Sequence, residues 1–172
     1  MTESSSPPEV VRYKQYDGDA LRRLLGQLGL TLQLVDDYKD IPGSFWGDEE
    51  AGLIKNTIYG RSDTPVHSFM HEACHFVCMD DKRRSNLHTN AGGSSDEENA
   101  VCYLQILLAD ALPGFGRSTM FKDMDAWGYS FRLGRTQRWF EEDAEDAHQW
   151  LKSRRLLELA DQLTELNRAA LG

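Results

Sequence analysis

Residues 64–78 read TPVHSFMHEACHFVC, and this is the most informative segment of the chain. Thr64-Pro65 is typical of a helix start, with a capping residue followed by proline at the first helical position. The apolar residues that follow recur at helical spacing and predict a helix that buries one face. They are Val66, Phe69, Met70, Ala73, Phe76 and Val77. A hydrophobic core is therefore expected against this helix.

The same stretch contains an HExxH motif, His71-Glu72-Ala73-Cys74-His75. Two histidines four residues apart project from one helical face, so both imidazoles can reach a single Zn²⁺ ion. Glu72 can act as the general base on a zinc-bound water. A helical histidine pair can also simply be solvated, but the apolar stripe places His71 and His75 at its flank, where a cleft can form.

A catalytic zinc normally has three protein ligands, so a third is required. The best source is Asp96-Glu97-Glu98, at the start of the next predicted helix. Glu97 shares a face with apolar residues of that helix, whereas Glu98 lines up with Cys102 and Gln105 and looks peripheral. Glu97 is therefore the predicted third ligand and Glu98 the alternative. Acidic residues here can also merely complement the helix dipole.

Two further candidates for the third ligand follow the motif. Asp81 lies six residues after His75, as in some metzincin peptidases, but those enzymes need glycine where this chain has Cys78. His88 lies in a polar segment, 80–95, that predicts a loop. A lone histidine in a loop is more often exposed than bound to a metal.

Three cysteines, Cys74, Cys78 and Cys102, are not the pattern of a disulfide framework, and we expect them to be reduced. Buried small apolar side chains are the simpler interpretation. Soft metal ligands or a redox-sensitive switch are the alternative.

The rest of the chain predicts a single domain over 11–172, preceded by a disordered tail over 1–10 that is rich in Ser, Pro and Glu. Residues 135–172 form a helical C-terminal extension, as one long or two shorter amphipathic helices. The other expected elements are helices over 19–28, from near Asp96 to 112, and over 124–131, and strands over 30–34 and 52–59.

The composition excludes several functions. The chain has 172 residues, 28 of them acidic and 19 basic, and a formal charge of −9, which argues against direct nucleic-acid binding. No run of 18 apolar residues predicts a membrane span, and the N-terminus lacks the features of a secretory signal. We therefore expect a cytoplasmic protein.

The order of these features resembles the gluzincin metallopeptidases, and within them the ImmA/IrrE-type family. That family has HExxH followed by a helix with a Glu-x-x-Ala-Asn-x-Phe-Ala pattern and a Leu pair. Here Glu97, Ala100, Tyr103 and Leu107-Leu108 occupy the matching positions, while Val101 stands where the family has Asn. The resemblance covers roughly residues 50–112.

The resemblance implies an α+β fold, with a small antiparallel or mixed sheet beside the HExxH helix and a glutamate-bearing helix, and additional C-terminal helices. It implies one zinc ion and a protein or peptide substrate, with a transcriptional regulator as a candidate partner. Strand Leu53–Tyr59 would be a sheet edge that pairs with an extended peptide.

Three C-terminal residues are candidate donors to the oxyanion: Tyr129, Arg132 and His148. The rival to a peptidase is a non-catalytic or regulatory zincin-like binding protein. A second rival is a zymogen whose cleft is covered by the N-terminal tail or by the 80–95 loop.

Overall fold

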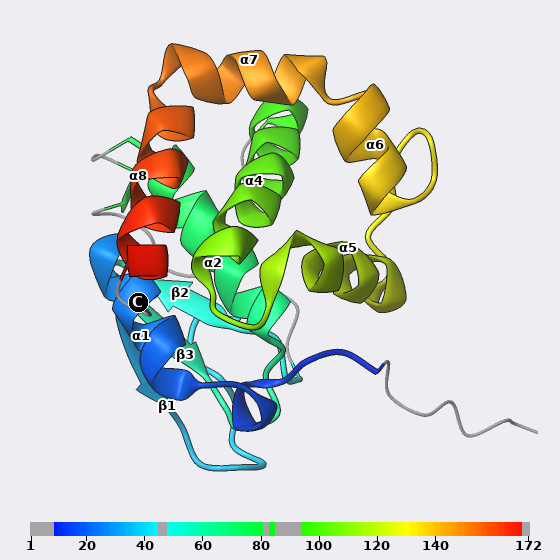
Figure 1. Cartoon of the computed structure of the whole chain (residues 1–172). Coiled ribbons are helices and arrows are strands. Elements are labelled where there is room, and N and C mark those ends of the chain that lie inside the picture. The colour runs from blue at the N-terminus through cyan, green and yellow to red at the C-terminus, as the bar shows by residue number, and fades with distance from the viewer. Residues whose placement is uncertain (1–8, 45–47, 81–82, 85–93, 170–172) are drawn as a thin grey trace, which may run out of the picture.

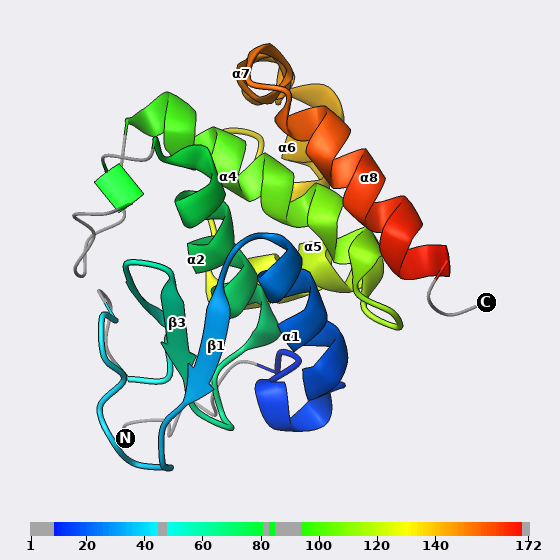
Figure 2. The same ribbon diagram turned by 90° about the vertical axis from the view of Figure 1, so that its left-hand side faces the viewer.

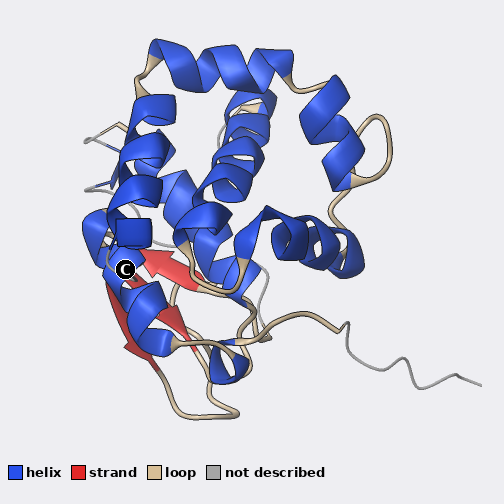
Figure 3. Ribbon diagram, viewed as in Figure 1, coloured by secondary structure: helices blue, strands red, loops and turns tan. Residues whose placement is uncertain are grey.

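The structure is a computed structural model that describes residues 9–44, 48–80, 83–84 and 94–169. The chain is α+β: a three-stranded mixed sheet lies at one end, and helices make up the rest (Figure 1, Figure 3). The predicted fold class and the small sheet are therefore confirmed.

The elements, with the labels of Figure 1, follow the chain in this order. They are α1 (Gly18–Gln27), β1 (Thr31–Leu34), β2 (Gly52–Ile54), β3 (Thr57–Gly60), α2 (Val66–Cys78), α4 (Ser95–Leu108), α5 (Gly116–Trp127), α6 (Thr136–Glu142), α7 (Glu145–Ser153) and α8 (Leu156–Ala169). Short 3-10 turns occupy Tyr13–Gln15 and Ala109–Ala111. Helices α1 and α2 contact the sheet, and α2 also contacts α4.

The sheet has the order β1-β3-β2, with β1 parallel and β2 antiparallel to β3. The prediction of one strand over 52–59 was wrong, because a two-residue turn at Lys55 and Asn56 divides it into a hairpin. Lys55 has a positive φ of 52°, which residues other than glycine rarely adopt. The turn is therefore not marked by a glycine at this position. The hairpin makes β3 the central strand.

The segment Leu53–Tyr59 does not form the single edge strand that we expected to bind a peptide. Strand β3 is internal, and the outer edge of β2 is covered by the segment 42–44. The Leu53 amide donates to the Gly43 carbonyl at 3.4 Å. A methyl group on Gly52 would lie 1.9 Å from the Pro42 carbonyl oxygen and 2.5 Å from the Ser44 nitrogen. Glycine at 52 is thus what allows the two backbones to approach.

We expect Gly52→Ala to destabilise the protein by about 1–3 kcal/mol, because the new methyl meets backbone atoms that no rotamer change can move away. Gly26→Ala on α1 is the matched control. Nothing lies within 4 Å of the position that its new methyl group would take, and alanine there should stabilise the helix by about 0.5–1 kcal/mol. Urea unfolding of both variants measures the two effects, and equal midpoints would contradict the close approach at Gly52.

Helix α4 lies between α2 and α8 (Figure 2) and also contacts α5 and α7. Its sequence explains this central position, because buried side chains project from almost every side of it. They are Glu97, Ala100, Val101, Cys102, Leu104, Gln105, Ile106 and Leu108. A helix packed on several sides has no single inward face. The apolar pattern of α4 therefore does not show which of the carboxylates in its first turn faces α2.

The C-terminal region has three helices, α6, α7 and α8, rather than the one or two that we predicted. The break between α7 and α8 lies at Arg154 and Arg155, and Arg155 has a positive φ of 61°. Trp139, Leu151 and Leu163 join these helices to the same hydrophobic core as α2 and α4. The region is thus an integral part of the core.

The chain before α1 is anchored to the core from Val10 onward. Residues 1–8 of the expected tail lie outside the described residues, but Val10 is buried. The Val11 amide donates to Asp123 Oδ2 on α5 at 2.9 Å, and Arg12 forms an antiparallel bridge with Pro65.

In the part of the chain that the structure describes, no helix is both long and apolar enough to cross a lipid bilayer.

Candidate metal centre

Helices α2 and α4 bring three metal-ligating side chains together: His71 and His75 from α2 and Glu98 from α4. Their ligand atoms all lie within 4.8 Å of one another. His75 Nε2 is 3.2 Å from His71 Nε2. Glu98 Oε1 is 3.1 Å from His71 Nε2, and Glu98 Oε2 is 3.0 Å from His75 Nε2. Three potential ligands therefore converge on one point.

These separations suit a zinc ion. Two ligand atoms bonded to zinc at 2.0–2.1 Å in tetrahedral geometry lie about 3.3 Å apart, close to the separations in the cluster. Two imidazole nitrogens and a carboxylate oxygen are also the donor set of many catalytic zinc sites. The residues present thus fit a zinc ion with a fourth position left for water or substrate.

The structure brings Glu98, and not Glu97, to the two histidines. Glu97 is buried, as expected, but its carboxylate accepts from Arg83 Nη1 at 2.7 Å and from Arg83 Nη2 at 3.0 Å. The face of α4 that carries Glu98, Cys102 and Gln105 is the one that meets α2. The sequence pattern ranked Glu97 above Glu98, whereas the structure places Glu98 in the cluster. Because α4 is buried on several sides, an inward direction does not single out the residue that faces the histidines.

The Glu98 carboxylate is suited to hold a cation. Burial alone would raise the pKa of Glu98, but hydrogen bonds from His71 and His75 outweigh it and hold that pKa well below its usual range. The carboxylate therefore stays ionised at neutral pH. Its side chain is 45% exposed, compared with 14% for His71 and 6% for His75, so it is the most accessible of the three candidate ligands.

Glu72 lies between the two histidines in sequence and is 9% exposed. Burial raises the pKa of Glu72, and the nearby carboxylates of Glu50 and Glu98 add to this, against the opposing effect of His71 and His75. A carboxylate with a raised pKa is a better proton acceptor than an ordinary one. Its buried environment therefore suits a carboxylate that accepts a proton.

Gln105 is a contact of the cluster that the sequence analysis did not assign. Its side chain is fully buried, and its Oε1 lies 2.9 Å from His71 Nδ1. The signal in the sequence was its place on α4, seven residues and two turns after Glu98. A buried amide among apolar neighbours requires hydrogen-bond partners, and here one of them is a metal-ligating histidine.

Comparison with known proteins assigns the chain to no family. No family model, curated protein or solved structure matches it.

Of the three candidate oxyanion donors, Tyr129 lies nearest the cluster, with its ring centroid 5.6 Å from that of His71. Its hydroxyl is 3.3 Å from His67 Nδ1 and 3.5 Å from Gln105 Nε2. Burial raises the pKa of Tyr129, so the phenol stays protonated. The hydroxyl lies on the Gln105 side of His71, away from the Nε2 atoms that face Glu98, and therefore supports the buried side of the site.

The other two candidate donors have different partners. His148 packs edge-on against Tyr103, with ring centroids 5.8 Å apart. Arg132 forms an ion pair with Asp143, in which its Nε donates at 2.8 Å. These contacts give each residue a structural role in the C-terminal region.

Asp81 and His88, the remaining candidates for the third ligand, lie outside the described residues. Arg84, which is described, donates from Nε to the Phe76 carbonyl at 2.8 Å and from Nη2 to the Val77 carbonyl at 2.9 Å. Carbonyl groups in the last turn of a helix lack hydrogen-bond partners within the helix, and Arg84 supplies donors to two of them at the end of α2.

Cys74, Cys78 and Cys102 are free and buried. Burial raises the pKa of Cys74 well above its usual value and that of Cys78 to about 12. Both are therefore thiols at neutral pH, and the thiolate is the form that binds metals and is oxidised. This fits the interpretation of these two side chains as small apolar core residues.

His67, one turn before His71, is fully buried, and burial, aided by His71 and Arg12, lowers its pKa to about 3. The unfolded chain binds a proton here below pH 6.5, whereas the folded chain does not until about pH 3. Between these pH values, His67 should lower the free energy of unfolding by about 1.4 kcal/mol for each unit by which the pH falls.

Replacing His67 by glutamine should therefore make the free energy of unfolding less dependent on pH between 6.5 and 4. Denaturant unfolding of the two proteins in the presence of a chelator gives both slopes without a contribution from bound metal. Identical slopes would mean that His67 takes up its proton equally in the folded and unfolded states.

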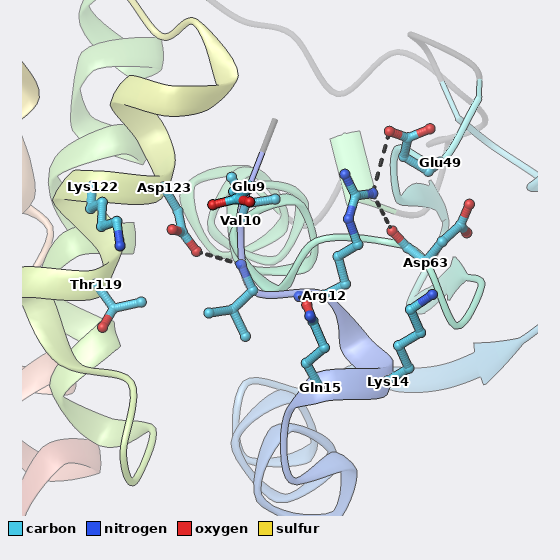
Figure 4. A pocket seen from close by; sticks show the side chains of 11 residues that line it. Glu9, Val10, Arg12, Lys14, Gln15, Glu49, Asp63, Thr119, Lys122 and Asp123 are labelled. Carbon is cyan, nitrogen blue, oxygen red and sulfur yellow. Dashed lines mark hydrogen bonds and ion pairs between the residues drawn. The ribbon is translucent and has the colours of Figure 1, made fainter. Parts of the chain in front are cut away.

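A cleft of about 820 Å³ lies apart from the metal cluster (Figure 4). It is bounded by the segment before α1, by α5 and by the loops that carry Glu49 and Asp63. Arg12 spans one side by donating to Glu49 Oε1 at 3.4 Å and to the Asp63 carbonyl at 2.8 Å. On the other side Asp123 accepts from the Val11 amide. These pairings hold the N-terminal segment in place.

Proposed function

We propose that the chain is a zinc-dependent metallopeptidase of the gluzincin type, with His71, His75 and Glu98 as zinc ligands and Glu72 as general base. The observation that carries this proposal is the convergence of two Nε2 atoms and a carboxylate at 3.0–3.2 Å from one another. The HExxH spacing and the buried Glu72 beside this point add the residue needed for hydrolysis. The ImmA/IrrE-type resemblance remains part of the proposal, with Glu98 in place of Glu97.

The side chains divide the chemistry as follows. When bound, zinc supplies a Lewis acid that lowers the pKa of a water molecule toward neutrality and polarises a carbonyl group. Glu72 accepts the proton that the attacking water gives up and passes it to the leaving amine. Glu98 contributes negative charge from α4, so the two helices must keep their relative position for the ligand set to be complete.

The proposed substrate is a peptide or a protein, with a transcriptional regulator as the candidate that the resemblance implies. We do not propose that this substrate binds by adding a strand to the sheet, because other residues of the chain already contact both outer strands. Gly43 accepts from Leu53 on β2, and Arg22 Nη1 donates to the Leu32 carbonyl on β1 at 2.9 Å. The solvent-exposed side of Glu98 is the approach that the geometry favours.

Metal content per chain tests this proposal. Protein purified without chelators or a nickel column should contain about one zinc ion per chain by mass spectrometry, and His75→Ala should lose it. Absence of zinc from the native protein, even after incubation with zinc salts and desalting, would refute the metal site. One bound zinc without hydrolysis of any tested peptide would instead favour the non-catalytic zincin-like binding protein.

A further inference from the structure

Gln105 joins the two helices of the metal cluster from its buried side. Its Nε2 donates to the main-chain carbonyl of His67 at 3.1 Å, and its Oε1 lies 2.9 Å from His71 Nδ1. Met120 Sδ and the Tyr129 hydroxyl each lie 3.5 Å from the same Nε2. The amide is fully buried, so these protein groups take the place of water around it.

The contacts decide which way the amide faces. A backbone carbonyl can only accept a hydrogen bond, so the group 3.1 Å from the His67 oxygen must be the amide NH₂. The reverse orientation would place two acceptor oxygens against each other in a buried site, at the cost of an unsatisfied polar group. Gln105 Oε1 therefore faces His71 as an acceptor.

An acceptor at that position also decides which nitrogen of His71 carries the proton. Oε1 has no hydrogen to donate, so His71 Nδ1 must carry one to make the 2.9 Å contact. In the neutral ring the lone pair then lies on Nε2, the atom that faces His75 and Glu98. This is the tautomer that a metal at the cluster needs.

We propose that Gln105 is a positioning residue that holds His71 in the Nδ1–H tautomer, with the Nε2 lone pair directed at the metal position. This inference rests on the proposed zinc site. The two histidines differ in this respect, because His75 Nδ1 is buried and has no hydrogen-bond partner among the described residues. Gln105, which lies on α4, thus orients the His71 ring on α2. This contact couples the geometry of the metal site to the packing of α4 on α2.

Gln105→Met tests the role of the amide, because methionine nearly preserves the volume and removes both polar atoms. Loss of an outer hydrogen-bond partner of a metal-bound histidine weakens metal affinity by about 10–100-fold. We expect a shift of this size in the zinc dissociation constant, measured by competition with a chromophoric chelator. Gln149→Met is the matched control, since Gln149 is exposed on α7 and donates to Glu145. Equal zinc affinity of Gln105→Met and native protein would overturn the proposal.

A second measurement needs no variant and no metal. Long-range ¹H–¹⁵N NMR of the histidine rings shows which ring nitrogens carry a proton. In metal-free native protein at pH 8 we expect a proton on His71 Nδ1, while Glu98, 3.1 Å from Nε2, can hold a second proton there until a metal replaces it. Finding Nδ1 without a proton would overturn the inference whatever the variant does. Because this readout is independent of zinc, a native chain that has the proton on Nδ1 yet binds no zinc would refute the proposed function and leave the orienting role of Gln105 standing.

Discussion

Glu98→Gln should greatly weaken zinc binding, whereas Glu97→Gln, one residue earlier, should leave zinc binding intact. The Glu98 oxygens lie 3.0–3.1 Å from the two histidine nitrogens, and the Glu97 oxygens are held by Arg83. Changes to residues that only support a metal ligand already weaken affinity by about 10–100-fold, so loss of a ligand charge should exceed about 100-fold. Competition titration with a chromophoric chelator measures both constants.

The two variants control for each other, because they make the same chemical change at adjacent positions of one helix. Thermal unfolding in the presence of a chelator shows whether either variant has lost its fold rather than its metal. Glu97→Gln is expected to be the less stable of the two, since it removes the charged partner of Arg83 at a buried position. Zinc loss in Glu97→Gln with retention in Glu98→Gln would reverse the assignment of the third ligand.

Glu72→Gln should abolish peptide hydrolysis while leaving zinc bound. Glutamine has nearly the same shape as glutamate but cannot accept the proton from the attacking water. Removal of a general base lowers a turnover rate by about 10²–10⁴-fold. Steady-state cleavage of an internally quenched fluorogenic peptide library, with zinc content measured on the same samples, gives both quantities.

Glu97→Gln serves again as the control in this assay, because Glu97 is also a buried glutamate at the start of α4 but its carboxylate is held by Arg83. It should retain cleavage. Hydrolysis that persists at the native rate in Glu72→Gln would remove Glu72 from the mechanism. Hydrolysis that is absent from native, zinc-loaded protein would favour the regulatory binding protein over the peptidase.

Local sequence patterns predicted the parts of this protein whose structure depends on neighbours along the chain. The helix of the HExxH motif is one example: α2 covers Val66–Cys78, with its apolar side buried. The spacing of His71 and His75 follows from the helical repeat alone, so their convergence needs no other element. The α+β class with its small sheet, in contrast, was implied by the resemblance to the gluzincins, and the structure has both.

Other features were missed because their sequence signals are weak. The turn at Lys55 and Asn56 has a non-glycine residue at positive φ, and the β-branched residues on both sides favour a continuous strand. The break at Arg155 has the same origin. In each case the tertiary structure holds a backbone conformation that the residue itself does not favour.

The order of residues is enough to predict a helix that carries two histidines and a glutamate, and acidic residues at the start of a later helix. Which of these carboxylates joins the histidines depends on long-range packing. That choice depends on the rotation of α4 about its own axis, and the rotation is set by simultaneous packing against α2, α5, α7 and α8. Because α4 is buried on several sides, its apolar pattern is compatible with more than one rotation. The observed rotation turns Glu98 and Gln105 toward α2 and leaves Glu97 with Arg83.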